Sequence, residues 1–209
     1  MTPDSSHIFP LLYAGPISYY SYWVKFDRFI DAHENFQKQT FRNRAKIYGA
    51  NGPITLTVPV KSGSQKIKIT DVEISNIESW QRDHWKTLVS AYQASPFFEY
   101  YAFLLEPIFQ KRYDSLWKFN MDIHHVILRC LQLPVQEQFT HSFHPIDRND
   151  LRAIYTSKKP HPQSTTFPKY QQVFSYDKPF ISDLSIFDAL FNLGPETEDY
   201  LLKLNLSFT

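Results

Sequence analysis

The sequence predicts an α/β fold, in which a single domain over residues 1–209 has a mixed β-sheet in its N-terminal half, packed by several α-helices. The N-terminal half has alternating apolar and polar runs around an Asn-Gly pair at residues 51–52, a strong short signal of a β-hairpin. Residues 78–94 and 115–133 instead repeat apolar side chains at helical spacing. A length of 209 residues fits one large domain better than two small ones.

The composition is that of a globular protein with no general attraction to polyanions. Hydrophobic residues make up 43% and charged residues 21%, which excludes an extended disordered chain. The net charge of +1 argues against a nucleic-acid partner. Cys130 is the single cysteine, so the sequence contains neither an internal disulfide nor a cysteine metal cage. No signal peptide and no membrane span is visible, and we expect a cytoplasmic protein.

The first elements follow from short apolar runs. Residues 8–13 are apolar and stop at the turn signal of residues 14–16, which predicts a buried strand. A helix is expected next, with Ser18 as its cap, although the alternation over residues 24–30 leaves a second strand open.

The hairpin is the element that the sequence predicts most clearly. Its strands are expected over residues 44–49 and 54–60, with one apolar and one polar face. Arg44 and Lys46 share the polar face, and Arg42 joins them if the first strand begins earlier. Three cationic side chains would then converge on one surface.

The rest of the chain is expected to be mainly helical. Further strands are predicted over residues 66–70, 72–74 and 136–143. Helices are predicted over residues 78–94, 97–105, 115–133, 148–155, 183–193 and 195–204, with Asp147 and Asp183 as caps and Gly194 at one C-terminus. Residues 158–168 contain three prolines and are expected to form a surface loop or lid.

The basic start of the hairpin is the first candidate binding site. Arg42, Asn43, Arg44 and Lys46 could hold a phosphate or carboxylate, because guanidinium groups match such anions with two parallel hydrogen bonds. The alternative is an ordinary solvated polar face, since strands often carry exposed basic residues.

Two histidines are candidate general bases. His84 lies four residues after Trp80 on the apolar side of its helix, where it could be a base or a hydrogen-bonded core residue. His33 is followed by Glu34, and adjacent residues in a strand point apart, so only one of the two can line a cleft. The other histidines lack the spacing of a zinc site, and no metal site is predicted.

Polar groups near the C-terminus give a further candidate site. Gln172 precedes the last predicted helices, and Asp188 follows the core position Phe187. If Asp188 is buried it needs a partner, for which Arg44 is a candidate. The dinucleotide, P-loop and hydrolase signatures are absent, so no cofactor is identified.

Four blocks of the sequence, in this order, resemble the WbqC-like protein family, in the form common in Bacteroidetes. The resemblance spans nearly the whole chain. The blocks are GPISYYS at residues 15–21, HENFQKQTFRNRAKI followed by NGPITLTVPV from residue 33, the run from Trp80 to Tyr101, and Y-x-Q-x-F with LSIFDALFNLGPE from residue 170.

The resemblance implies a cytoplasmic step on an activated or amino sugar, because members often lie among genes for O-antigen and other surface polysaccharides. Many members carry a His-Gln-Pro segment after the first strand, which this chain lacks. If that histidine carries chemistry in the family, this protein either uses His33 or His84 for it or does something else. Residues that fall in the family's blocks gain weight as site residues: Lys38, Asn43, Arg44, Trp80, His84, Gln172 and Asp188.

Two functions follow from these observations. The first is a transferase whose partner is a small molecule, a sugar nucleotide or acyl donor, with Arg42, Arg44 and Lys46 on the anionic group and His84 or His33 as base. The alternative is a non-catalytic protein that binds a glycan or a partner enzyme through surface aromatics such as Tyr19, Tyr20, Phe97, Phe98 and Tyr100.

Overall fold

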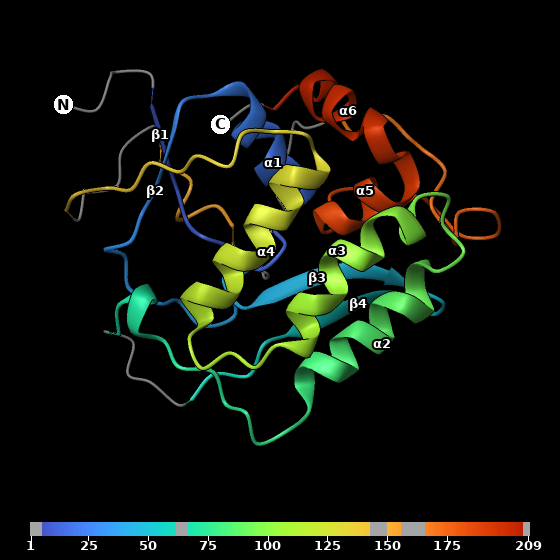
Figure 1. Ribbon diagram of the computed structural model, residues 1–209. Helices are drawn as coiled ribbons and strands as arrows, with labels where there is room; N and C mark the ends of the chain where they lie inside the picture. Colours follow the sequence, from blue (N-terminus) through green and yellow to red (C-terminus); the bar gives the residue numbers. More distant parts are fainter. Residues whose placement is uncertain (1–5, 62–66, 143–149, 156–165, 207–209) are drawn as a thin grey trace.

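The computed structural model describes residues 6–61, 67–142, 150–155 and 166–206, and it has the predicted α/β class (Figure 1). The helices gather around two small sheets, both in the N-terminal half of the chain. The predicted α/β class was correct. The described strands, however, form two separate pairs, whereas we expected one mixed sheet.

The first pair is parallel and is built around a helix. β1 (His7–Phe9) pairs with β2 (Arg28–Ile30), and α1 (Ile17–Lys25) connects them. Both predicted elements after residue 16 are therefore present, the helix first and the strand second. Parallel single-residue bridges extend the pair on both sides, from Ile8 to Asp150 and from Ile30 to Phe139. The strand expected over residues 136–143 shrinks to the bridge at Phe139.

The second pair is the predicted hairpin. β3 (Arg44–Gly49) and β4 (Gly52–Thr57) are antiparallel, and Gly49 pairs with Gly52. The turn is therefore Ala50-Asn51, one residue earlier than the Asn-Gly pair suggested, and Gly52 follows it with a φ of 113° that favours glycine. The strands expected over residues 66–74 are instead single bridges around the 3-10 helix η1 (Ile69–Asp71).

The helices match the periodicity of the sequence closely. They are α2 (Trp80–Tyr92), α3 (Phe98–Gln110), α4 (Leu116–Cys130), α5 (Ile186–Leu193) and α6 (Thr197–Lys203), with the 3-10 turn η2 (Gly194–Glu196) before the last. Residues 150–155 form turns rather than the end of a predicted helix, and the cap expected at Asp147 lies outside the described residues. No helix of the described part has the length and apolar character needed to cross a bilayer.

Two predicted helix caps were wrong, and one contact explains both. Ser18 lies inside the first turn of α1, where its backbone N–H and its hydroxyl donate to the Asp183 carboxylate at 2.8 and 2.9 Å. Asp183 thus caps α1, because the unsatisfied N–H groups of a helix start favour a carboxylate. Ser185 caps α5 in its place, accepting a hydrogen bond from the Phe187 N–H.

The core is rich in aromatic rings. One hydrophobic cluster of the described residues extends from Phe9 to Leu204, and its largest fully buried side chains include Trp23 and several tyrosines. Cys130 lies in this core, where burial raises the pKa of its thiol to about 12. The thiol is therefore protonated near neutral pH, which disfavours a role as a nucleophile.

Ser185→Ala should lower the free energy of unfolding by about 1–2 kcal/mol. The Ser185 hydroxyl caps α5 and donates to the carbonyl of Ala14 at 2.7 Å, so the substitution leaves a buried carbonyl without its donor. Urea unfolding measures the loss. Ser79→Ala is the matched control, because Ser79 is the N-cap of α2 but makes no capping hydrogen bond. Equal losses in the two variants would contradict the prediction.

Candidate functional site

A buried arginine joins the two sides of the parallel strand pair. Arg152 Nε lies 2.9 Å from both carboxylate oxygens of Asp150, its Nη2 also pairs with Asp150, and its Nη1 pairs with Asp31. Asp31 directly follows β2, and Asp150 is bridged to β1. All three side chains are buried. Sequence reasoning missed this cluster, because an Asp-x-Arg spacing carries no signal until burial is known.

A second buried pair adjoins the first. Arg42 Nε donates to Glu34 Oε1 at 2.8 Å, and its Nη2 donates both to Glu34 Oε2 and, at 3.1 Å, to the carbonyl of Arg152. Arg42 is fully buried and precedes β3, so it does not join Arg44 and Lys46 on the polar face of the hairpin. The predicted convergence of three cationic side chains was wrong, because a carboxylate inside the molecule binds the first of them.

The charge network, defined as Asp31, Glu34, Arg42, Asp150 and Arg152, brings three carboxylates and two guanidinium groups into the interior. Burial raises the pKa of Glu34, and the charge and hydrogen bonds of Arg42 only partly oppose this. Burial alone would lower the pKa of Arg152, but its bonds to Asp150 and Asp31 outweigh burial and raise it. Buried charges are costly to desolvate, so they must keep their partners in place.

The network fixes the backbone that carries His33. The backbone N–H of His33 donates to Asp31 Oδ1 at 2.8 Å, and Thr140 Oγ1 donates to the same oxygen at 2.9 Å. His33 itself is half-buried, whereas Asp31 and Glu34 beside it are buried. Residues 33 and 34 lie outside the described strands, so the strand on which the sequence argument relied is absent there, and of the two side chains His33 is the more exposed.

His84 occupies a different environment, inside the aromatic core. Its Nδ1 lies 3.0 Å from the Tyr13 hydroxyl, the ring makes a hydrogen bond to the backbone of Thr57, and Trp80 packs edge-on against it at 5.2 Å. Burial lowers the pKa of His84 to about 4. The ring is therefore neutral near pH 7 and already bonded, which fits the alternative of a core histidine better than that of a base.

The C-terminal candidates do meet, in a cluster of neutral partners. Gln172 Nε2 donates to Asp188 Oδ2 at 2.8 Å, Tyr170 donates to the same oxygen, and Tyr92 donates to Oδ1 at 3.0 Å. Burial raises the pKa of Asp188, although the three hydrogen bonds oppose the shift. The suggestion that Arg44 is its partner was wrong, because hydroxyl and amide donors satisfy this carboxylate.

The remaining predicted residues divide between packing and surface. Asn43 is buried and donates to the Val58 carbonyl at 2.9 Å, and Trp80 Nε1 donates to Asn76 at 3.3 Å. Arg44 is half-buried, and Lys38 and Lys46 are exposed. The structure thus brings His84 together with Trp80 and Gln172 together with Asp188, and it puts Arg42 in the charge network, while the site roles assigned from the sequence stay predictions. Within the described ranges no group of His, Cys, Asp and Glu side chains is placed to hold a metal ion.

Arg42→Met should lower the free energy of unfolding by about 3–5 kcal/mol, because it leaves the Glu34 carboxylate buried without its cation. The double variant Arg42→Met/Glu34→Leu should recover most of this loss, since neither charge then remains. Urea unfolding of both variants tests the pair. A double variant less stable than Arg42→Met would show that the network is held by something other than this pairing.

Acid should destabilise the fold through His84. A histidine whose folded pKa lies below its unfolded value stabilises the protein fully above about pH 6.5, and this stability is lost as the pH falls toward 4. At about 1.4 kcal/mol per pH unit, the share lost by pH 5 is roughly 2 kcal/mol. The stability difference between the wild type and His84→Gln should therefore shrink by that amount between pH 7 and 5. A constant difference would contradict the assignment.

The comparisons with known proteins identify the family alone. No curated protein and no solved structure matches the chain. The model of the WbqC-like protein family matches residues 12–161, more than half of the 209 residues. That range includes α1, the hairpin, α2 to α4 and the charge network. The chain therefore belongs to the WbqC-like protein family.

Proposed function

We propose that this protein acts in the biosynthesis of a surface polysaccharide, as a transferase on an activated or amino sugar, in the cytoplasm. Membership of the family supports a role in this pathway, because the resemblance implies that such proteins are encoded among O-antigen genes. The observation that carries the proposal is the charge network, whose five buried charged residues include Asp31, which accepts a hydrogen bond from the backbone of the half-buried His33.

His33 is the proposed general base. A base must reach a substrate, and the His33 side chain is half-buried while its backbone N–H is bonded to Asp31 Oδ1. His84 is instead buried and neutral, with its ring itself bonded to Tyr13 and Thr57. We therefore assign His84, together with Trp80, to the packing of α2 against the core.

The anionic part of the substrate is assigned to the polar face of the hairpin. Arg44 lies opposite Thr57 and Lys46 opposite Thr55, so two basic residues alternate along one strand with a threonine across from each. Lys38, in the exposed turn before this strand, is a third candidate contact. Arg42 is excluded because Glu34 occupies its guanidinium group. A nucleoside diphosphate matches such donors.

The reaction needs only a proton acceptor and an anion site. A hydroxyl or amine of the acceptor attacks the activated carbon of the donor, and the new bond forms as the bond to the leaving nucleoside diphosphate or thiol breaks. His33 takes the proton that the nucleophile loses. The electron pair of the broken bond leaves with the departing group, and Arg44 and Lys46 balance its negative charge.

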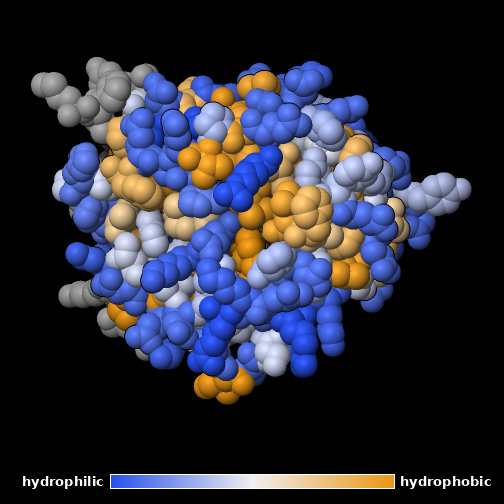
Figure 2. All heavy atoms as spheres, viewed as in Figure 1, coloured by the Kyte–Doolittle hydropathy of each residue, from blue (hydrophilic) through white to orange (hydrophobic). Residues whose placement is uncertain are grey.

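A second candidate function is non-catalytic binding through the outer face of α3. Most of the aromatic rings that we expected on the surface from the sequence are buried, among them Tyr19, Tyr20 and Phe98. This argues against the binding surface predicted from the sequence. Tyr100 is 69% exposed, however, and Phe103 one turn later is 66% exposed. Hydrophobic side chains gather near the middle of the face shown in Figure 2, over α3 and α4. Such a patch favours a partner protein.

The proposal predicts a thermal shift with sugar nucleotides or acyl-CoAs. A ligand that binds only the folded state raises the melting temperature. Arg44→Gln should weaken binding of the responding compound by about tenfold or more, because it removes a charge-assisted hydrogen bond. Arg129→Gln, an exposed arginine on α4, is the control and should bind normally.

His33→Gln should leave that binding in place and lower turnover about 10²–10⁴-fold, the usual contribution of a general base. Product formation with the responding donor measures the effect. The opposite pattern, with His84→Gln inactive and His33→Gln active, would move the base to α2. A panel without any response would favour binding through α3, which Tyr100→Ala/Phe103→Ala tests by co-purification.

A further inference from the structure

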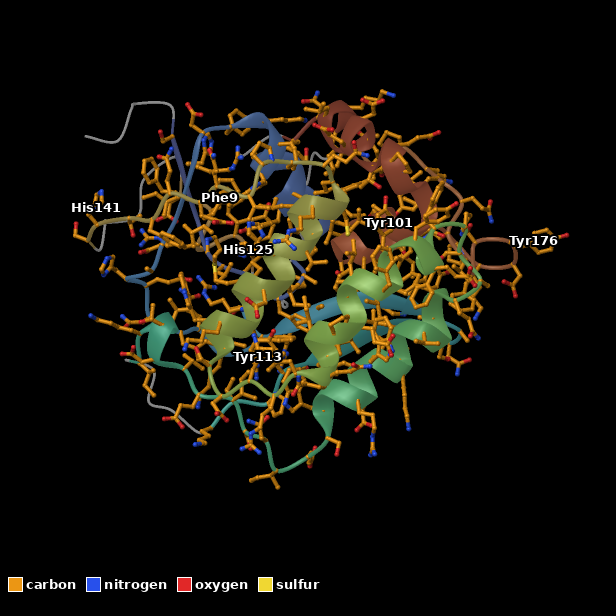
Figure 3. The ribbon with its side chains drawn as sticks, viewed as in Figure 1. Phe9, Tyr101, Tyr113, His125, His141 and Tyr176 are labelled. Atoms are coloured by element: carbon orange, nitrogen blue, oxygen red, sulfur yellow. The ribbon has the colours of Figure 1, made fainter. Side chains whose placement is uncertain are left out.

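An open groove of about 900 Å³ lies where the end of α3, the start of α4 and η1 meet. Tyr113, which lines it, lies between the ends of these two helices in Figure 3. None of the site residues predicted from the sequence lines this groove. Its volume is within the range of about 300–1,000 Å³ that ligand pockets occupy.

Among the described residues that line the groove, the charges balance and are mostly paired. It is lined by four cations and four anions, namely Lys61, Lys111, Arg112, Lys118, Asp71, Glu73, Asp114 and Asp122. Lys111 lies 3.0 Å from Asp122, Arg112 lies 3.5 Å from Asp114, and Lys61 pairs with Glu73. These pairs are exposed to solvent, so their oxygens and N–H groups stay available to a ligand. A strongly charged ligand gains nothing from such a surface.

An aromatic face completes the groove. Trp117, on the first turn of α4, lines it beside Met121 one turn later, and both are half-buried. The Trp117 ring packs against Phe139 at 6.1 Å, which supports the indole from one side. The Tyr113 ring is covered by the Lys111 ammonium at 4.6 Å, so Trp117 is the aromatic side chain that a ligand would meet.

We propose that this groove binds a neutral oligosaccharide, with Trp117 packed against the C–H face of one sugar ring and the Lys111–Asp122 and Arg112–Asp114 pairs bonded to its hydroxyls. A sugar has an apolar face and a rim of hydroxyls that both donate and accept, which matches an indole flanked by carboxylates and cations. The inference rests on the proposed function for one point, that the saccharide is the acceptor chain to which the transferred group is added.

Saturation-transfer NMR and calorimetry on the full chain test the groove, with chitotriose and maltotriose as probes. An exposed site with one stacking ring predicts a dissociation constant on the order of 1 mM or below. Trp117→Ala should weaken binding about tenfold, and Trp117→Phe should retain most of it. Comparison of the Phe and Ala variants distinguishes the loss of ring stacking from a general loss of structure. The melting temperature of each variant measures any loss of structure.

The charged rim has a matched control. Arg112→Gln/Asp114→Asn should weaken binding severalfold, whereas Arg82→Gln/Asp83→Asn, an equally exposed pair on α2 outside the groove, should not. Loss of binding in both double variants, or its persistence in Trp117→Ala, would overturn the inference. So would the absence of binding by either trisaccharide at about 10 mM, or Trp117-dependent binding of triphosphate in their place.

The two proposals fail separately in these experiments. The sugar-nucleotide response and its dependence on Arg44 should be unchanged in Trp117→Ala. Trisaccharide binding without any donor response would support the proposed saccharide groove and contradict the proposed transferase activity. A donor response without trisaccharide binding would support the transferase and contradict the groove.

Discussion

Two buried arginines, Arg42 and Arg152, hold together segments that no continuous sheet joins. Arg152 connects the turns at residues 150–155 to the end of β2 through Asp31, and Arg42 connects the start of β3 to Glu34. The contact from Arg42 to the Arg152 carbonyl makes the two pairs one network. Strands of three residues give few backbone hydrogen bonds, so directional side-chain bonds position these segments instead.

Polar side chains also position the segments at the C-terminal end of the chain. Asp183 caps α1, Ser185 bonds to the Ala14 carbonyl, and the Ser185 N–H donates to the Lys46 carbonyl at 2.7 Å. Asp188 adds a cluster of hydroxyl and amide donors that fastens residues 170–181 to α5. Each of these groups is buried, and a buried polar group without a partner costs free energy. The chain is thereby held to one arrangement more strictly than aromatic packing alone would hold it.

The same division between buried and exposed polar groups organises the chemistry. Buried groups such as Arg42, His84 and Asp188 bond to other parts of the protein and fix its geometry. Groups that reach the surface can still meet a ligand, which describes the half-buried His33 and the exposed charge pairs of the groove beside Trp117. Burial, more than residue type, therefore separates the residues that support a site from those that can meet a substrate.

The sequence by itself determined the α/β class, the hairpin, four helices to within three residues, the start of α3 and the family, because periodicity, turn chemistry and motif spacing are local properties of the chain. It also indicated residues 33–46 as the place to look for a site. Only the tertiary structure decided what each polar residue there does. Glu34 and Arg42 are eight residues apart, and Asp31 and Arg152 are separated by 121, so no local pattern reveals either pair. Whether a charged side chain faces water or another charge depends on segments distant in sequence. For this reason Arg42, which was expected to contact a ligand, is instead a buried residue of the interior.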